Sequence, residues 1–104
     1  MSPETQKIYS LIGIARKSNN VVSGEFKTEK AVKDKKAALV IVAEDASDNT
    51  KKNFTDMCTY YNVPIVFFGV KSELGHWFGK EVRASLAVLD KGLADAIVKQ
   101  LRLM

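Results

Sequence analysis

The chain has 104 residues, of which 46% are hydrophobic and 27% charged, and its formal net charge is +4. This length suits one domain and is too short for two ordinary ones, and the composition excludes a disordered chain. The single cysteine, Cys58, and the single histidine, His76, exclude an internal disulfide and leave no ligand set for a structural zinc site.

No apolar stretch approaches the ~20 residues that span a bilayer, and the first residues lack the apolar core of a secretion signal. We therefore expect a cytoplasmic protein with a single domain over residues 1–104, no membrane partner, no metal and no cofactor. A positive net charge favours polyanionic partners through long-range attraction.

The first half of the chain begins with strong helix signals. Ser2-Pro3-Glu4 supplies an N-cap, a first-turn proline and a first-turn acid, which predict a helix ending near Arg16. The short apolar piece 21–23 predicts an edge strand. Acids near the start and lysines near the end then predict a short helix over residues 25 to about 34.

Two apolar runs dominate the middle of the chain. The segments 38–46 and 63–69 carry turn chemistry at their ends and predict buried parallel strands. Between them, Ser47-Asp48-Asn49 predicts the start of a helix. One face of that helix carries Phe54, Met57, Cys58 and Tyr61. Because of this spacing we expect Cys58 to be a small core residue rather than a reactive thiol.

The last third predicts a brief helix over 72–78 ending at Gly79, an apolar strand over 85–89, and a final helix after Asp90-Lys91-Gly92. The resulting order is αβαβαβαβα. Since crossover helices must cover both faces of such a sheet, the sequence predicts an α/β fold, a three-layer α/β/α sandwich with a mixed sheet of about four strands.

Catalytic motifs are absent from the sequence. It contains no Gly-x-Ser-x-Gly elbow, no phosphate-binding loop and no dinucleotide fingerprint, so we expect neither an enzyme nor a small-molecule substrate. The adjacent acids Glu44 and Asp45 follow a strand and could hold Mg²⁺. An enzyme would require a cleft around Glu44, Asp45 and Gly69. The simpler interpretation places the two acids near the positive N-terminus of the helix that follows.

A basic cluster has a stronger physical case. It comprises Lys27, Lys30, Lys33, Lys35 and Lys36, preceded by Arg16 and Lys17. A helix that begins after Ser23-Gly24 directs free backbone N–H groups and the positive end of its dipole toward an approaching anion. Phosphate binding beside this helix start is therefore one interpretation, and a solvated helix face is the other.

Three short motifs resemble a known family. Ala43-Glu44-Asp45-Ala46 closes one strand, Val63-Pro64 opens the next, and Leu74-Gly75 follows soon after. Together they are similar to the ribosomal-protein superfamily that includes the large-subunit proteins L7Ae and L30e, over roughly residues 10–101. The resemblance implies a non-enzymatic RNA-binding protein, often of kink-turns. It is strongest to the small bacterial members, with ribosomal or another structured RNA as partner and ribosomal proteins as further candidates.

Kink-turn binders of this superfamily open their second helix with Gly-Thr-Asn-Glu and carry a lysine three residues later. The similarity places Gly24 at the family glycine and Lys30 at the family lysine, which contacts sheared guanine–adenine pairs. Glu25, Phe26 and Lys27 replace the threonine, asparagine and glutamate. A phenyl ring cannot replace the paired donor and acceptor of asparagine, so Phe26 either stacks on a base or anchors the helix in the core.

The second RNA-contacting element of the family is a loop, here Gly79–Ala84. Val82 would cover a flipped-out base there, and Arg83 would stack on a base or pair with phosphate unless it is a solvated loop arginine. The resemblance thus implies a set of RNA-binding residues: Gly24, Glu25, Phe26, Lys27, Lys30, Lys33, Val82 and Arg83. This hypothesis requires the helix start and the loop to share one face. The alternative is a protein-interaction adapter of the same fold that contacts its partner through Trp77, Phe78 or Val82.

Overall fold

A computed structural model describes all of residues 1–104 and contains five helices and four strands. In chain order they are α1 (Pro3–Lys17), β1 (Val21–Ser23), α2 (Glu25–Lys33), β2 (Leu39–Val42), α3 (Asp48–Tyr61), β3 (Ile65–Phe67), α4 (Lys71–Phe78), β4 (Ser85–Val88) and α5 (Lys91–Arg102). The predicted order αβαβαβαβα is confirmed.

The four strands form one mixed sheet in the order β1-β4-β2-β3. Strand β2 runs parallel to β3, with Ile41 opposite Val66, as the two apolar runs predict. Strand β4 is antiparallel to both of its neighbours and places Leu86 opposite Ser23 of β1 and Ile41 of β2. Strand β1 lies at the edge, as predicted.

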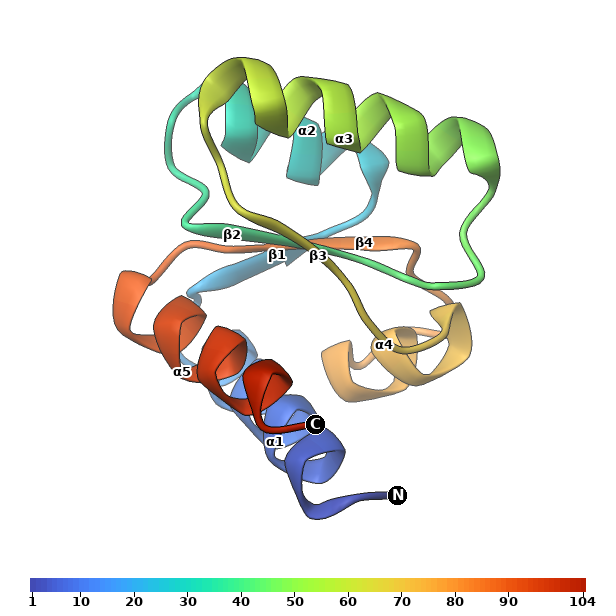
Figure 1. Ribbon diagram of the computed structural model, residues 1–104, viewed down its shortest axis with the longest axis vertical. Coiled ribbons are helices and arrows are strands. Elements are labelled where there is room, and N and C mark those ends of the chain that lie inside the picture. Colours follow the sequence, from blue (N-terminus) through green and yellow to red (C-terminus); the bar gives the residue numbers. More distant parts are fainter.

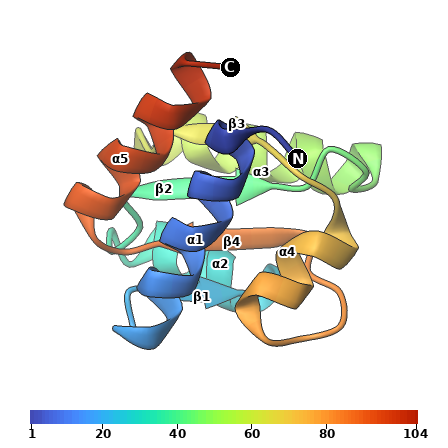
Figure 2. The ribbon, with the colours of Figure 1, turned by 90° about the horizontal axis from the view of Figure 1, so that it is seen from below.

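Helices cover both faces of this sheet, so the predicted three-layer α/β/α sandwich is confirmed (Figure 1). Helices α2 and α3 lie on one face, and α1, α4 and α5 lie on the other. Figure 2 shows the layer of α1, α4 and α5 from its outer side, with α1 between α5 and α4. The helices α1 and α5 pack directly against each other.

The core is centred on β2 and β4, whose residues are all buried. Phe54 and Cys58 of α3 enter it from the predicted helix face, and Met57 and Tyr61 pack at its margin. The prediction that both parallel strands are buried is wrong for β3, where Phe67 keeps 42% of its surface exposed. The reason is that β3 is a three-residue strand at the edge of the sheet and has a neighbour on one side only.

Side chains cap the starts of three helices, α1, α3 and α5, and the caps of α1 and α3 confirm the predictions at Ser2 and Ser47. The backbone N–H groups of Thr5, Thr50 and Leu93 donate to the side-chain oxygens of Ser2 (3.1 Å), Ser47 (3.1 Å) and Asp90 (2.8 Å). Each cap satisfies one of the backbone donors that a helix start leaves without an intrahelical acceptor.

The prediction that places the Asp45 carboxylate at the start of α3 is wrong. Its Oδ1 accepts the backbone N–H of Lys71 at 2.8 Å, so it caps α4 rather than α3. Parallel neighbours bring the loops after β2 and β3 to one edge, where the Glu44 N–H also donates to the Gly69 carbonyl (2.8 Å). The Lys71 N–H bond to Oδ1 gives Asp45 a capping role, and no group of three His, Cys, Asp or Glu side chains gathers as metal ligands do.

None of the helices combines the length and the apolar character needed to cross a lipid bilayer.

Burial of Cys58 generates a direct test. Only 1% of this residue is exposed, and burial raises the pKa of its thiol to about 11. Since the thiolate is the reactive form, we expect a thiol reagent at pH 8 to label the native protein at least ~100-fold more slowly than the urea-unfolded protein. Labelling of the native chain at the unfolded rate, followed by absorbance, would contradict the core assignment.

Candidate nucleic-acid interface

The antiparallel pairing of β1 with β4 brings two distant segments together. Strand β1 ends where β4 begins, and the Gly24 N–H donates to the Ser85 carbonyl at 3.0 Å. The chain leaves β1 directly into α2 and enters β4 directly from the loop 79–84. The start of α2 and this loop therefore lie side by side on one face of the molecule, as the hypothesis requires.

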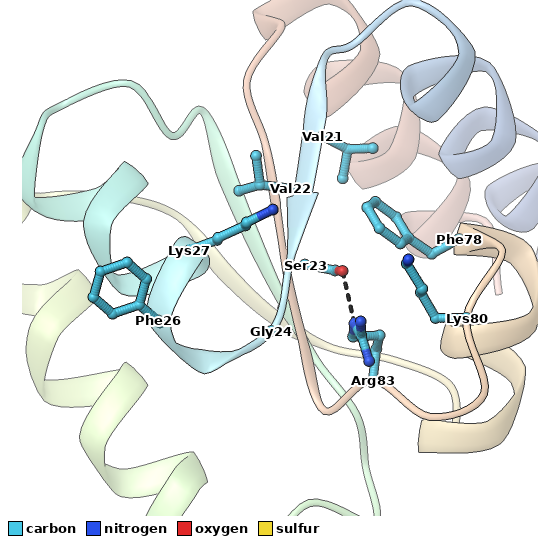
Figure 3. A pocket seen from close by; sticks show the side chains of 9 residues that line it. All are labelled: Val21, Val22, Ser23, Gly24, Phe26, Lys27, Phe78, Lys80 and Arg83. Carbon is cyan, nitrogen blue, oxygen red and sulfur yellow. Dashed lines mark hydrogen bonds between the residues drawn. The ribbon is translucent and has the colours of Figure 1, made fainter.

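A groove of about 340 Å³ lies between these two segments (Figure 3). Its floor is the end of β1, with Lys27 on the α2 side and the end of α4 and the loop on the other. Its lining comprises Val21, Val22, Ser23, Gly24, Phe26, Lys27, Phe78, Lys80 and Arg83. Three of these side chains are cations and none is a carboxylate, so the groove presents a positive surface.

Gly24 shapes the α2 end of the groove. Its φ of 92° and ψ of 157° lie in a backbone region that is open essentially to glycine alone. As the N-cap it has no side chain to accept the first N–H groups of α2, and no side-chain cap is present. The positive end of the α2 dipole and its free N–H donors are consequently left available for an anion.

Arg83 is held in place by the protein. Its Nε donates to Ser23 Oγ at 2.8 Å, and its Nη1 donates to the Val82 carbonyl at 2.7 Å. The side chain is half-buried, so its interpretation as a solvated loop arginine is wrong. Of the five N–H donors of a guanidinium, three remain without a partner and are available beside the groove.

Helix α4 fixes the conformation of the loop. The Lys80 N–H donates to the Gly75 carbonyl (2.7 Å), and the Arg83 N–H donates to the Lys71 carbonyl (3.0 Å). The backbone of Glu81 and Val82 lies so close that a Cβ on Gly75 would come within 2.7 Å of it. Gly75, from the Leu74-Gly75 motif, therefore permits the loop to dock on the helix.

Phe26 does not anchor α2. Its ring is 78% exposed, so the predicted core role is wrong. The buried positions are Thr28, Ala31 and Val32, and Ser85 Oγ donates to Thr28 Oγ1 at 3.3 Å. Two residues apart on a helix, Phe26 and Thr28 point to opposite sides, which leaves the phenyl ring in solvent at the rim of the groove.

The lysines of α2 differ in their surroundings. Lys27 lines the groove, and no carboxylate lies within ion-pair distance of it. Lys30 pairs with Asp34 (3.0 Å) and lies beside Lys27, in an adjoining hollow. Lys33 pairs with Glu29 (2.7 Å), and this hydrogen bond raises the pKa of Lys33.

The remaining predicted residues lie around the groove rather than in it. Glu25 is exposed in the first turn of α2, and Val82 is 49% exposed in the loop.

The Trp77 ring is half-buried and stacks on Tyr9, with ring centroids 5.7 Å apart. Burial, and then the charges of Glu73 and Glu44, raise the pKa of Tyr9. The adapter alternative stays a prediction, with Val82 as its most exposed contact.

Three residues at the groove lie outside the predicted RNA-binding set. Lys80 and Phe78 belong to its lining, and the Arg16 guanidinium lies 5.8 Å from the centroid of the Phe78 ring. The charge of Lys80 within the predicted loop was the available signal. Arg16 comes from the end of α1, and only the packing of α1 against α4 brings it here.

Docking of the loop on Gly75 can be tested by one methyl group. Gly75→Ala forces the Glu81 and Val82 backbone to move, and we expect it to lower the free energy of unfolding by about 1 to 3 kcal/mol. The matched control is Gly13→Ala in α1, where an added Cβ meets nothing within 4 Å. Gly13→Ala should raise the free energy of unfolding by about 0.4 to 1 kcal/mol. Equal effects in urea unfolding would contradict the close approach.

Comparison with known proteins identifies one family over most of the chain. Residues 6–98 match the model of the Ribosomal protein L7Ae/L30e/S12e/Gadd45 family. The chain is 41% identical over 93 residues to RNA-binding protein YlxQ of Bacillus subtilis (strain 168), covering 89% of this chain and 93% of that protein. It is 37% identical over 89 residues to RNA-binding protein YlxQ of Enterococcus faecium, covering 86% and 85%.

Two solved structures share the fold. A protein with unknown function from Bacillus halodurans C superposes with a TM-score of 0.88 at 32% identity, covering 92% of this chain and 97% of that one. The Giardia lamblia 15.5kD RNA binding protein has a TM-score of 0.80 at 23% identity, covering 100% and 92%, which is a likeness of fold. The match over residues 6–98 and the identity to the bacterial relatives lead to one conclusion: the chain belongs to the Ribosomal protein L7Ae/L30e/S12e/Gadd45 family.

Proposed function

We propose that this protein is a non-enzymatic RNA-binding protein that holds a structured RNA between the start of α2 and the loop 79–84. The observation that carries the proposal is the groove, where the uncapped helix end and three cations converge without a carboxylate. The bacterial relatives named RNA-binding protein support the same function.

The groove offers two kinds of contact to RNA. Lys27, Lys80 and the free N–H groups of α2 bind phosphate oxygens, which supplies salt-dependent affinity. Arg83 is already held by Ser23 and Val82, so its remaining donors can engage a phosphate or the O6 and N7 edge of guanine with little further loss of side-chain freedom.

Apolar side chains beside these cations suit unstacked bases. Phe26 and Val82 are both exposed next to the groove, and neither is required by the core. Splayed-out bases in RNA loops and bulges stack on aromatic rings and lie against small apolar groups. We therefore assign Phe26 to base stacking and Val82 to covering a flipped-out base.

The finer proposal is a kink-turn-like RNA, ribosomal or otherwise, bound in the cytoplasm. Lys30 takes the position of the family lysine, exposed beside Lys27 with only a surface ion pair to Asp34. Since Phe26 and Lys27 replace an amide and a carboxylate, we propose that recognition relies on the bent backbone and its phosphates more than on base edges.

The salt dependence of binding tests the groove. We expect the Lys27→Ala, Arg83→Gln double variant to bind a kink-turn hairpin at least about tenfold more weakly than wild type. The negative slope of log K against log salt should become shallower by ~1.5, because two cations are removed. Lys52→Ala is the control, because Lys52 is an exposed lysine of α3 that pairs with Asp56 and does not line the groove. Filter binding at several salt concentrations gives both quantities. A wild-type chain that binds no RNA at low salt would refute the proposed function.

Kink-turn recognition needs a separate comparison. We expect a hairpin with its sheared guanine–adenine pairs intact to bind about tenfold, or roughly 1.4 kcal/mol, more tightly than the same hairpin with Watson–Crick pairs there. Equal affinities, measured by competition at constant salt, would contradict kink-turn recognition and would still agree with binding of structured RNA. Capture of ribosomal proteins that survives nuclease, together with no RNA binding, would favour the adapter alternative.

A further inference from the structure

We propose that a second hollow, between α1 and α4, receives an unpaired nucleotide of the RNA strand that leaves the groove. Its base lies against Trp77, and its phosphates pair with Arg16 and Lys17. This inference rests on the proposed function and extends its binding surface beyond the start of α2 and the loop.

The hollow has the size and charge for such a ligand. It measures about 330 Å³ and is lined by Ser10, Gly13, Ile14, Arg16, Lys17 and Trp77. Its only ionisable side chains are the two cations at the end of α1, and neither takes part in an ion pair. Two unpaired cations beside an aromatic ring match the pattern of sites that bind single-stranded nucleic acid.

Gly13 opens the floor of the hollow. It lies within α1, where glycine weakens a helix relative to alanine, and a Cβ there would meet nothing within 4 Å. Packing of the protein therefore gives no reason for a glycine at this position. The missing side chain leaves a flat stretch of helix beside Trp77, which a planar base can approach.

Trp77 supplies the stacking surface. Tyr9 covers one face of the indole in a near-parallel stack at 14°, and the His76 ring lies nearly perpendicular to it, with centroids 5.8 Å apart. The half-buried indole also borders the hollow. Ile14, 52% exposed, adds an apolar edge. Bases within a duplex are stacked on their neighbours, so only an unpaired nucleotide can place its face on this ring.

The hollow adjoins the groove. The Arg16 guanidinium lies over the Phe78 ring, and a Cβ on Gly79 would come within 2.7 Å of it. Phe78 lines the groove and Arg16 lines the hollow, so the two sites share this pair of side chains as a common wall. An RNA strand that leaves the groove past the start of the loop 79–84 reaches Arg16 first and the hollow next.

Trp77 is the only tryptophan, so its fluorescence reports on the hollow directly. The probes are a blunt kink-turn hairpin, the same hairpin with six unpaired uridines at the 5′ or the 3′ end, and octauridylate alone. We expect one of the two extensions to tighten binding at least about fivefold and to quench Trp77, whereas the blunt hairpin leaves the fluorescence nearly unchanged.

Variants separate this site from the groove. Gly13→Leu fills the hollow with a good helix former, and Lys17→Ala removes one cation; both should abolish the gain from the extension and keep the blunt-hairpin affinity. Thermal unfolding checks that both variants fold. An undiminished gain in Gly13→Leu, or no quenching by either extension or by octauridylate, overturns the inference and leaves the hollow open to a protein partner.

Failure of the proposed function has a different signature. In that case the blunt hairpin does not bind the wild-type chain at all, whatever happens at Trp77. Quenching by octauridylate that Gly13→Leu abolishes would then still support the hollow as a single-strand site, because this probe does not need the groove.

Discussion

The antiparallel pairing of β1 with β4 is the constraint on which the candidate interface depends. It places the end of one strand beside the start of another, and the Gly24 N–H to Ser85 carbonyl bond fixes that junction. Two segments about 60 residues apart in sequence therefore meet, and Arg83 joins them through Ser23. Neither the uncapped end of α2 nor the loop would form a groove without this pairing.

Glycines at the interface act through their backbone and through the space that they leave. Gly24 adopts a conformation that side chains oppose, and it leaves the first donors of α2 uncapped. Gly75 admits the loop backbone to contact with α4. The family resemblance rests partly on the Leu74-Gly75 motif, and the structure gives that motif a physical purpose, since a docked loop holds Arg83 in position before any ligand binds.

Charge is distributed in a way that the net value of +4 does not reveal. Lys30 and Lys33 have acidic partners one turn away on α2, whereas the cations of the groove and of the α1 hollow have none. A polyanion that enters the groove meets Lys27, Lys80 and Arg83 and no carboxylate in its lining. The cluster apparent in the sequence is thus less informative than the subset that the fold leaves unpaired.

The sequence by itself determined the element order, the helix caps at Ser2 and Ser47, the burial of Cys58 and the family, because capping and periodicity are local properties. Only the tertiary structure decided the strand order, the helix that Asp45 caps, the exposure of Phe26 and the place of Arg16. Each of these depends on which segments become neighbours, and that is set by the packing of the whole sheet and its helices rather than by any short stretch of chain.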